Sequence, residues 1–142
     1  FILNSESSLV GDQLEWLKSG VSDYEIALPL HEMHSFARAE GYYAGLPLAI
    51  RQAQIDRILA LYDQLYPTLR VYLFDARRMF SAPLTVFGPL LAVLYIGQNY
   101  LVFRDSERVQ SFSRHFDILV REAAVSDREF MPYLKDLRSE LA

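Results

Sequence analysis

The sequence predicts an α+β fold, in which a mainly antiparallel sheet of about four or five strands carries packed helices within a single domain. The centre of the chain supplies the sheet. Residues 69–103 contain only four charged side chains, and Pro and Gly residues divide this apolar stretch into short pieces rich in β-branched and aromatic residues. The regions on either side carry apolar residues at spacings of three, four and seven, which is typical of helices that pack on a sheet.

Four segments of the central stretch are expected to be strands: residues 69–75, 84–87, 91–96 and 100–103. Segment 91–96 is apolar on both alternating faces, which predicts a strand in the middle of the sheet. A Gly-Gln-Asn turn follows at 97–99 and a Gly-Pro reversal stands at 88–89, so the last segments should pair as antiparallel hairpins. The same punctuation argues against a membrane-spanning helix, although residues 79–103 lack charge over a sufficient length.

Two long helices are expected to flank these strands. One covers residues 48–66 and ends before Pro67. Its apolar stripe consists of Leu48, Ile55, Leu59, Tyr62 and Tyr66. The other covers residues 106–124, with Asp105 or Ser106 as the N-cap.

Shorter helices are expected near both ends. Residues 31–40 and 12–18 carry suitable patterns. Near the C-terminus, Ser126 and Glu129 fit a capping box, but Pro132 would then fall in the second turn. Either that helix kinks or it begins at the proline.

Composition excludes several function classes. The 142 residues suit one domain, and 14 basic against 18 acidic residues give a net charge of −4, which repels nucleic-acid phosphates. The chain has no cysteine, so disulfides, thiolate nucleophiles and cysteine-ligated metals are excluded. The chain begins at Phe1 without a signal-peptide pattern. We interpret residues 1–22 as a connector to a missing N-terminal module and expect a cytoplasmic protein.

Five residues are candidate ligand contacts: Arg70, Tyr72, Arg77, Tyr95 and His115. Arginine on or beside an apolar sheet needs an anionic partner, which is either a bound carboxylate or phosphate or a nearby acid such as Asp75. Tyrosines supply pocket walls with polar tips, but they also fill cores. His115 either contacts a ligand or is partly covered, with one ring nitrogen bonded to a neighbour.

A histidine pair raises the alternative of a small metal-dependent hydrolase. His31 and His34 stand three apart, whereas the zinc-protease helix places its histidines four apart so that both share one face. His115 could supply a third ligand. We expect ordinary polar residues here, no bound metal or cofactor, and a non-enzymatic protein.

Apolar residues near the two ends of the chain predict a homodimer. The proposed contacts are Leu14, Trp16, Leu17, Leu134, Leu137 and Leu141. One domain of this size buries only part of such a supply, and large exposed apolar patches usually mark interfaces. The alternative is that these leucines complete the monomer's own core.

Residues 66–125 resemble the C-terminal domain of bacterial one-component transcription regulators, in which an Xre-type helix-turn-helix precedes an α/β sensor or dimerisation domain. The resemblance rests on YPTLRVYLFD at 66–75, TVFG at 85–88 and HFD at 115–117. It implies effector sensing, dimerisation or both, with a small-molecule effector as a further partner. It also implies that DNA is bound only through a module outside this chain. A ligand-free interaction subunit is the remaining alternative.

Overall fold

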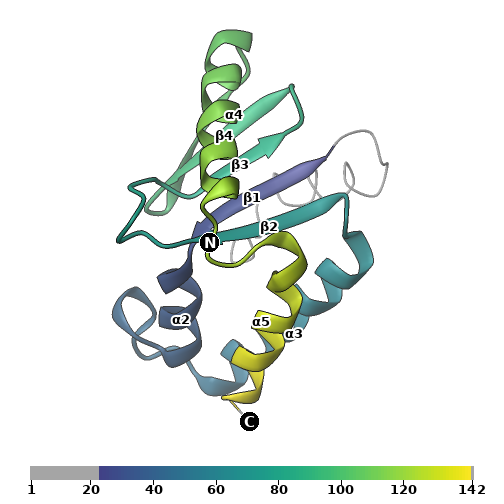
Figure 1. The fold of residues 1–142 in the computed structure, drawn as a ribbon. Coiled ribbons are helices and arrows are strands. Elements are labelled where there is room, and N and C mark those ends of the chain that lie inside the picture. Colours follow the sequence, from purple (N-terminus) through teal and green to yellow (C-terminus); the bar gives the residue numbers. More distant parts are fainter. Residues whose placement is uncertain (1–22, 142) are drawn as a thin grey trace.

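The structure is a computed structural model that describes residues 23–141, and it contains an open five-stranded sheet (Figure 1). The strands are β1 (Tyr24–Pro29), β2 (Leu69–Phe74), β3 (Leu84–Phe87), β4 (Leu91–Ile96) and β5 (Asn99–Phe103). Their order in the sheet is β2-β1-β3-β4-β5. β1 and β2 run parallel, and the other neighbours are antiparallel. The predicted α+β fold with a mainly antiparallel sheet is confirmed.

β1 is the strand that the sequence pattern did not reveal. It lies between β2 and β3, and every residue except Glu25 is buried. A strand covered on both faces loses the alternation of apolar and polar residues that marks a strand in a sequence. Pro29 also joins it directly to α2 (Leu30–Arg38), so no loop separates the two elements.

The predicted hairpins are confirmed, but the middle of the sheet belongs to β3 rather than to β4. Residues 91–96 form an interior strand that pairs with β3 on one side and β5 on the other. All four residues of β3 are buried, whereas β4 becomes exposed towards Ile96. The prediction failed because β4, although it lies next to the edge strand β5, is also covered on both faces near its start.

The remaining helices are α3 (Leu48–Leu65), α4 (Ser106–Arg121) and α5 (Asp127–Ser139), and a 3-10 turn, η1 (Gly41–Tyr43), follows α2. Asp105 is the N-cap of α4, since its carboxylate accepts a hydrogen bond from the backbone N–H of Arg108. In α5 the backbone N–H of Ser126 donates to Oε1 of Glu129 at 3.0 Å. The helix therefore begins at the predicted capping box and contains Pro132.

The helices cover the two faces of the sheet unequally. α4 crosses one face and packs on β1 to β4 through Phe116 and Leu119 (Figure 1). α2, α3 and α5 pack on the other face, against β1 and β2. Among residues 23–141, no helix has both the length and the apolar character needed to cross a membrane.

The predicted dimer contacts near the C-terminus are wrong for two leucines. Leu134 is 0% exposed and Leu137 is 3% exposed, because both face the core shared by α5, α3 and the sheet. Leu141 is partly buried against the same core. These residues complete the monomer's own core, which was the alternative. Leu14, Trp16 and Leu17 lie outside the described residues.

The apolar stripe of α3 differs from the predicted one at both ends. Ile55, Tyr62 and Leu65 are the buried residues of this helix. Leu48, at the first position of the helix, is 46% exposed, and Tyr66 lies just beyond the last turn with 36% exposed. Tyr66 has extended backbone, with φ of −66° and ψ of 138°, so it no longer follows the helical stripe.

We predict that Leu134→Ala lowers the free energy of unfolding by about 2–5 kcal/mol, because it leaves a cavity in the core. Leu90→Ala is the matched control, since Leu90 is 46% exposed in the turn between β3 and β4, and it should cost less than about 1 kcal/mol. Urea unfolding followed by circular dichroism measures both changes. Equal losses would contradict the assignment of Leu134 to the core.

Candidate functional site

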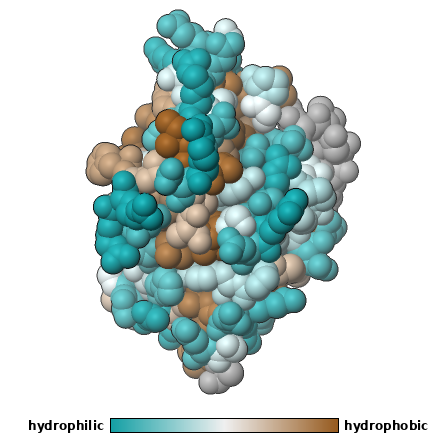
Figure 2. Space-filling view, in the orientation of Figure 1, coloured by the Kyte–Doolittle hydropathy of each residue, from teal (hydrophilic) through white to brown (hydrophobic). Residues whose placement is uncertain are grey.

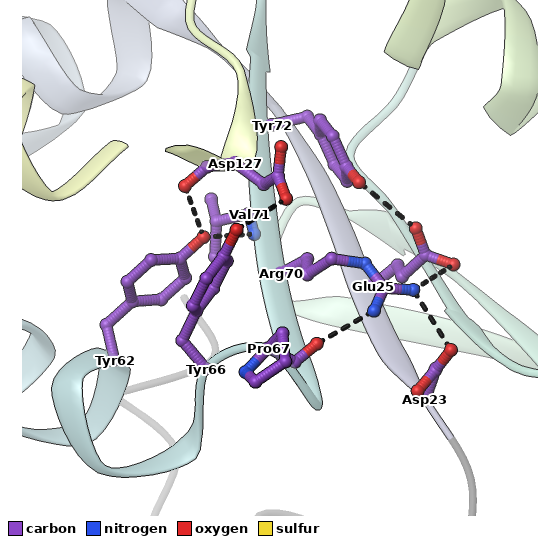
Figure 3. Close-up of polar contacts among 9 residues, drawn as sticks. All are labelled: Asp23, Glu25, Tyr62, Tyr66, Pro67, Arg70, Val71, Tyr72 and Asp127. Atoms are coloured by element: carbon purple, nitrogen blue, oxygen red, sulfur yellow. Dashed lines mark hydrogen bonds and ion pairs between the residues drawn. The ribbon is translucent and has the colours of Figure 1, made fainter. Parts of the chain in front are cut away.

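Arg70, the first candidate ligand residue, is enclosed by two carboxylates (Figure 3). It is the second residue of β2 and lies opposite Glu25 of β1. Its guanidinium Nη2 is 3.1 Å from Asp23 Oδ2 and 3.2 Å from Glu25 Oε1, and Nη1 donates to the carbonyl of Pro67 at 2.7 Å. An anionic ligand at Arg70 would therefore meet two negative charges. The salt-bridge alternative holds, with partners supplied by β1 and the residue before it.

Tyr72 lies on the other side of the same Glu25 carboxylate (Figure 3). Its hydroxyl donates to Glu25 Oε2 at 3.4 Å, and its ring packs edge-on against Phe116 of α4, with centroids 5.9 Å apart. Burial, with a smaller contribution from the Glu25 charge, raises the pKa of Tyr72 to about 12. The structure thus brings Arg70 and Tyr72 together, but a carboxylate of the chain occupies the position between them.

Arg77 and His115 do not join this cluster. Arg77 follows the far end of β2, and Nε and Nη2 of its 91% exposed side chain lie 3.2 and 3.1 Å from the two carboxylate oxygens of Asp75. Hydrogen bonds from Arg77 hold the pKa of Asp75 below its usual range. Nε2 of His115 is 2.9 Å from Oγ of Ser81, which is the bonded, partly covered arrangement expected for a structural histidine.

Tyr95 lies on the opposite face of the sheet from Tyr72. It packs with the core under α2, α3 and α5, next to Tyr100 at a centroid distance of 6.5 Å. Tyr72 belongs to the cluster under α4. The sheet itself therefore separates the predicted tyrosines, and the five candidate residues do not form one pocket.

The two histidines of α2 also point to different surroundings. The side chain of His31 is 62% exposed beside Glu32, whereas the ring of His34 packs edge-on against Tyr133 of α5. His115 belongs to α4 on the other face of the sheet. In the described part of the chain, no three His, Cys, Asp or Glu residues are placed to hold a metal ion.

The outer edge of β2 has partners for its backbone groups. The N–H of Val71 donates to the Tyr62 hydroxyl at 3.3 Å, and the N–H of Leu73 donates to the Val125 carbonyl at 2.9 Å. The carbonyl of Leu73 accepts from the N–H of Val125 at 3.1 Å in return. Tyr62 is itself held, because its hydroxyl donates to the carbonyl of Asp127 at 2.8 Å (Figure 3). This edge of the sheet is closed to a further strand.

The outer edge of β5, which we call the β5 edge, has no such cover from the described part of the chain. β4 is the only neighbour of β5 within residues 23–141. Asn99, Tyr100 and Leu101 are exposed, and no residue of the strand is charged or proline. Its pairing with β4 is continuous from Asn99 to Phe103, without a bulge. Natural proteins usually protect a free edge with charges, proline or bulges, and β5 has none of these.

The turn before β5 fixes which backbone groups face outward. Gly97 has φ of 60° at the first position of a two-residue turn, and Ile96 lies opposite Asn99. In such a hairpin the closing pair is hydrogen-bonded, and bonded pairs alternate along the strands. Asn99, Leu101 and Phe103 therefore bond to β4. The N–H and C=O groups of Tyr100 and Val102 point away from the sheet.

Apolar side chains accompany these backbone groups. Leu101 lies opposite Leu94, which packs under α4, so Leu101 belongs to the α4 face. Leu101 is 48% exposed, and Ile96, two residues beyond Leu94, is 56% exposed. Figure 2 views the molecule from this side and shows apolar side chains reaching the surface along one flank of α4. Tyr100, 45% exposed, belongs to the opposite face.

Sequence reasoning located β5 but did not identify its edge as a site. The available signal was the absence of charge between residues 79 and 103. A protected edge strand would carry a lysine, a proline or an inward-pointing charge within that stretch. The order of the strands, which the sequence does not reveal, decides which uncharged segment lies at the edge.

Comparisons with known proteins found no match among protein-family models, curated proteins or solved structures. The interpretation of the β5 edge therefore depends on its own geometry and on general properties of sheet edges.

We predict that the phenol of Tyr72 makes folding stability fall at alkaline pH. Its pKa is raised to about 12 in the folded chain, above the value near 10 for an unfolded tyrosine. Its contribution is therefore fully present below about pH 10 and is lost between about pH 10 and 12. Tyr72→Phe should reduce the alkaline slope of the unfolding free energy by up to about 1.4 kcal/mol per pH unit.

Urea unfolding at several pH values across this range measures the slope for the wild type and the variant. Tyr42→Phe is the control, because Tyr42 is 75% exposed. A slope that Tyr72→Phe leaves unchanged would contradict the assignment.

Proposed function

We propose that this chain is the self-associating regulatory domain of a bacterial transcription regulator, and that a module outside the chain contacts DNA. The observation that supports the proposal most is the uncovered β5 edge. Its outward N–H and C=O groups and its exposed Leu101 match what a second polypeptide strand requires. The net charge of −4 agrees with a domain that does not bind DNA by itself.

The contrast between the two edges of the sheet supports association through β5 specifically. Tyr62 bonds to the outer N–H of Val71 and Val125 bonds to both outer groups of Leu73, so a further strand cannot pair along β2 without breaking these hydrogen bonds. At β5 an added strand would break no hydrogen bond that the structure gives among residues 23–141. Edge strands without protection are the usual templates for pairing between chains.

In this proposal, a small-molecule effector would favour either the associated or the separate state and so change the position of the attached DNA-binding modules. Arg70 and Arg77 are each paired with carboxylates of the chain. The proposed effector is therefore not an anion that these two arginines bind.

We predict that the wild-type chain, of 16.4 kDa, associates into a dimer and that Leu101→Lys weakens the dimer. A lysine on an edge strand keeps its charge in water and opposes pairing, so the dissociation constant should rise at least about tenfold. Leu48→Lys is the matched control, because Leu48 is 46% exposed on α3 and Leu101 is 48% exposed. Light scattering coupled to gel filtration measures the mass.

The control variant should associate like the wild type. A wild-type chain that stays monomeric at every concentration measured would contradict the proposed function, because self-association must then be absent. Equal loss of association in both variants would contradict the role of the β5 edge.

A further inference from the structure

We infer that β5 pairs with β5 of a second copy in antiparallel orientation, with Leu101 on the two-fold axis. This inference rests on the proposed self-association and specifies the partner and the register. A symmetric dimer places the same surface of both copies in contact. Two identical strands satisfy this condition when they run antiparallel about an axis perpendicular to the sheet.

The outward backbone groups select the register. Only Tyr100 and Val102 within β5 present their N–H and C=O groups to a new strand. An axis at Leu101 places Tyr100 of each copy opposite Val102 of the other, so both outward residues form hydrogen-bonded pairs. With the axis at Tyr100, Val102 would have to pair with Gln98 of the other copy. With the axis at Val102, Tyr100 would have to pair with Arg104. Gln98 and Arg104 both lie outside the strand. The axis at Leu101 is the register in which all five residues of β5 overlap.

The side chains are compatible with this register. Leu101 would meet its own copy at a position without hydrogen bonds, where side chains are closest, and both leucines lie on the α4 face. Tyr100 would lie opposite Val102 on the other face, which is a favourable aromatic and β-branched pair. No charged residue lies between Ile96 and Phe103, and Arg104 would lie opposite Gln98. The pairing therefore brings no like charges together.

The other edge of the sheet limits the assembly to two copies. Pairing at β5 would join the two sheets into one, with β2 at both ends. In β2 the outer N–H of Val71 and both outer groups of Leu73 already have partners within their own chain. The two-fold contact uses the β5 edge of both copies. Among the described residues, no free sheet edge then remains on which a filament could grow. A five-residue strand pair is small for an interface, so the dimer should depend on concentration.

Cysteine cross-linking tests the register directly, because the chain has no cysteine of its own. Antiparallel residues opposite each other without hydrogen bonds have Cα atoms about 4.5 Å apart, which is within the range for a disulfide. Leu101→Cys should therefore form a covalent dimer under mild oxidation. Tyr100→Cys is the matched control, since Tyr100 is 45% exposed but would lie more than about 7 Å from its own copy.

The expected result is that Leu101→Cys cross-links at least about tenfold faster than Tyr100→Cys at equal concentration. In a second measurement, a mixture of Tyr100→Cys and Val102→Cys should form the mixed disulfide faster than either variant alone forms its own. This mixture keeps Leu101 in place. A faster reaction of Tyr100→Cys, or no preference for the mixed pair, would overturn the register.

The two proposals fail in different ways. If light scattering finds a dimer but neither cysteine test shows the expected preference, the domain associates by another surface or register and this inference is wrong. If the wild-type chain is monomeric at all concentrations, the proposed function fails as well. Reduced Leu101→Cys should keep the helical and strand circular dichroism of the wild type, so that a lack of cross-linking is not caused by unfolding.

Discussion

The backbone groups along the two edges of an open sheet must find partners, and this constraint explains much of the architecture. At β2 the chain itself meets the requirement: Tyr62 from α3 caps the N–H of Val71, and residues 124–125 pair with Leu73. The path from α4 to α5 therefore passes along β2 and carries α5 to the face opposite α4. The same hydrogen bonds that close this edge also hold α3 and α5 against the sheet.

Polar side chains of β2 bond to carboxylates of β1 and of the residue before it. Arg70 forms ion pairs with both Asp23 and Glu25, and Tyr72 donates to the same Glu25 carboxylate. A partly buried cation with two anionic partners has little remaining capacity for an external anion. The β5 edge is the opposite case, because its strand lacks charge and its outer groups have no partner among the described residues. The proposed second copy would supply there what α3 and residues 124–125 supply at β2.

The sequence pattern predicted most of the fold: turn residues marked both hairpins, and cap residues marked an N-cap at Asp105 or Ser106 and a capping box at Ser126. It missed β1, because a strand buried on both faces has no alternation to detect. It also could not decide whether Leu134 and Leu137 face the core or a partner, since an apolar stripe looks the same in either case. Which of the predicted ligand residues share a face of the sheet also could not be read from the sequence. Separation of Tyr72 and Tyr95 by the sheet depends on strand order, which one-dimensional spacing does not contain.

Amide hydrogen exchange reports directly whether a second copy covers the β5 edge. The N–H groups of Tyr100 and Val102 point outward, whereas the N–H of Leu101 bonds to β4. The account predicts that exchange at Tyr100 and Val102 slows as protein concentration rises, while exchange at Leu101 is slow throughout. Exchange at Tyr100 and Val102 that stays at the rate of an unprotected peptide at every concentration would contradict it.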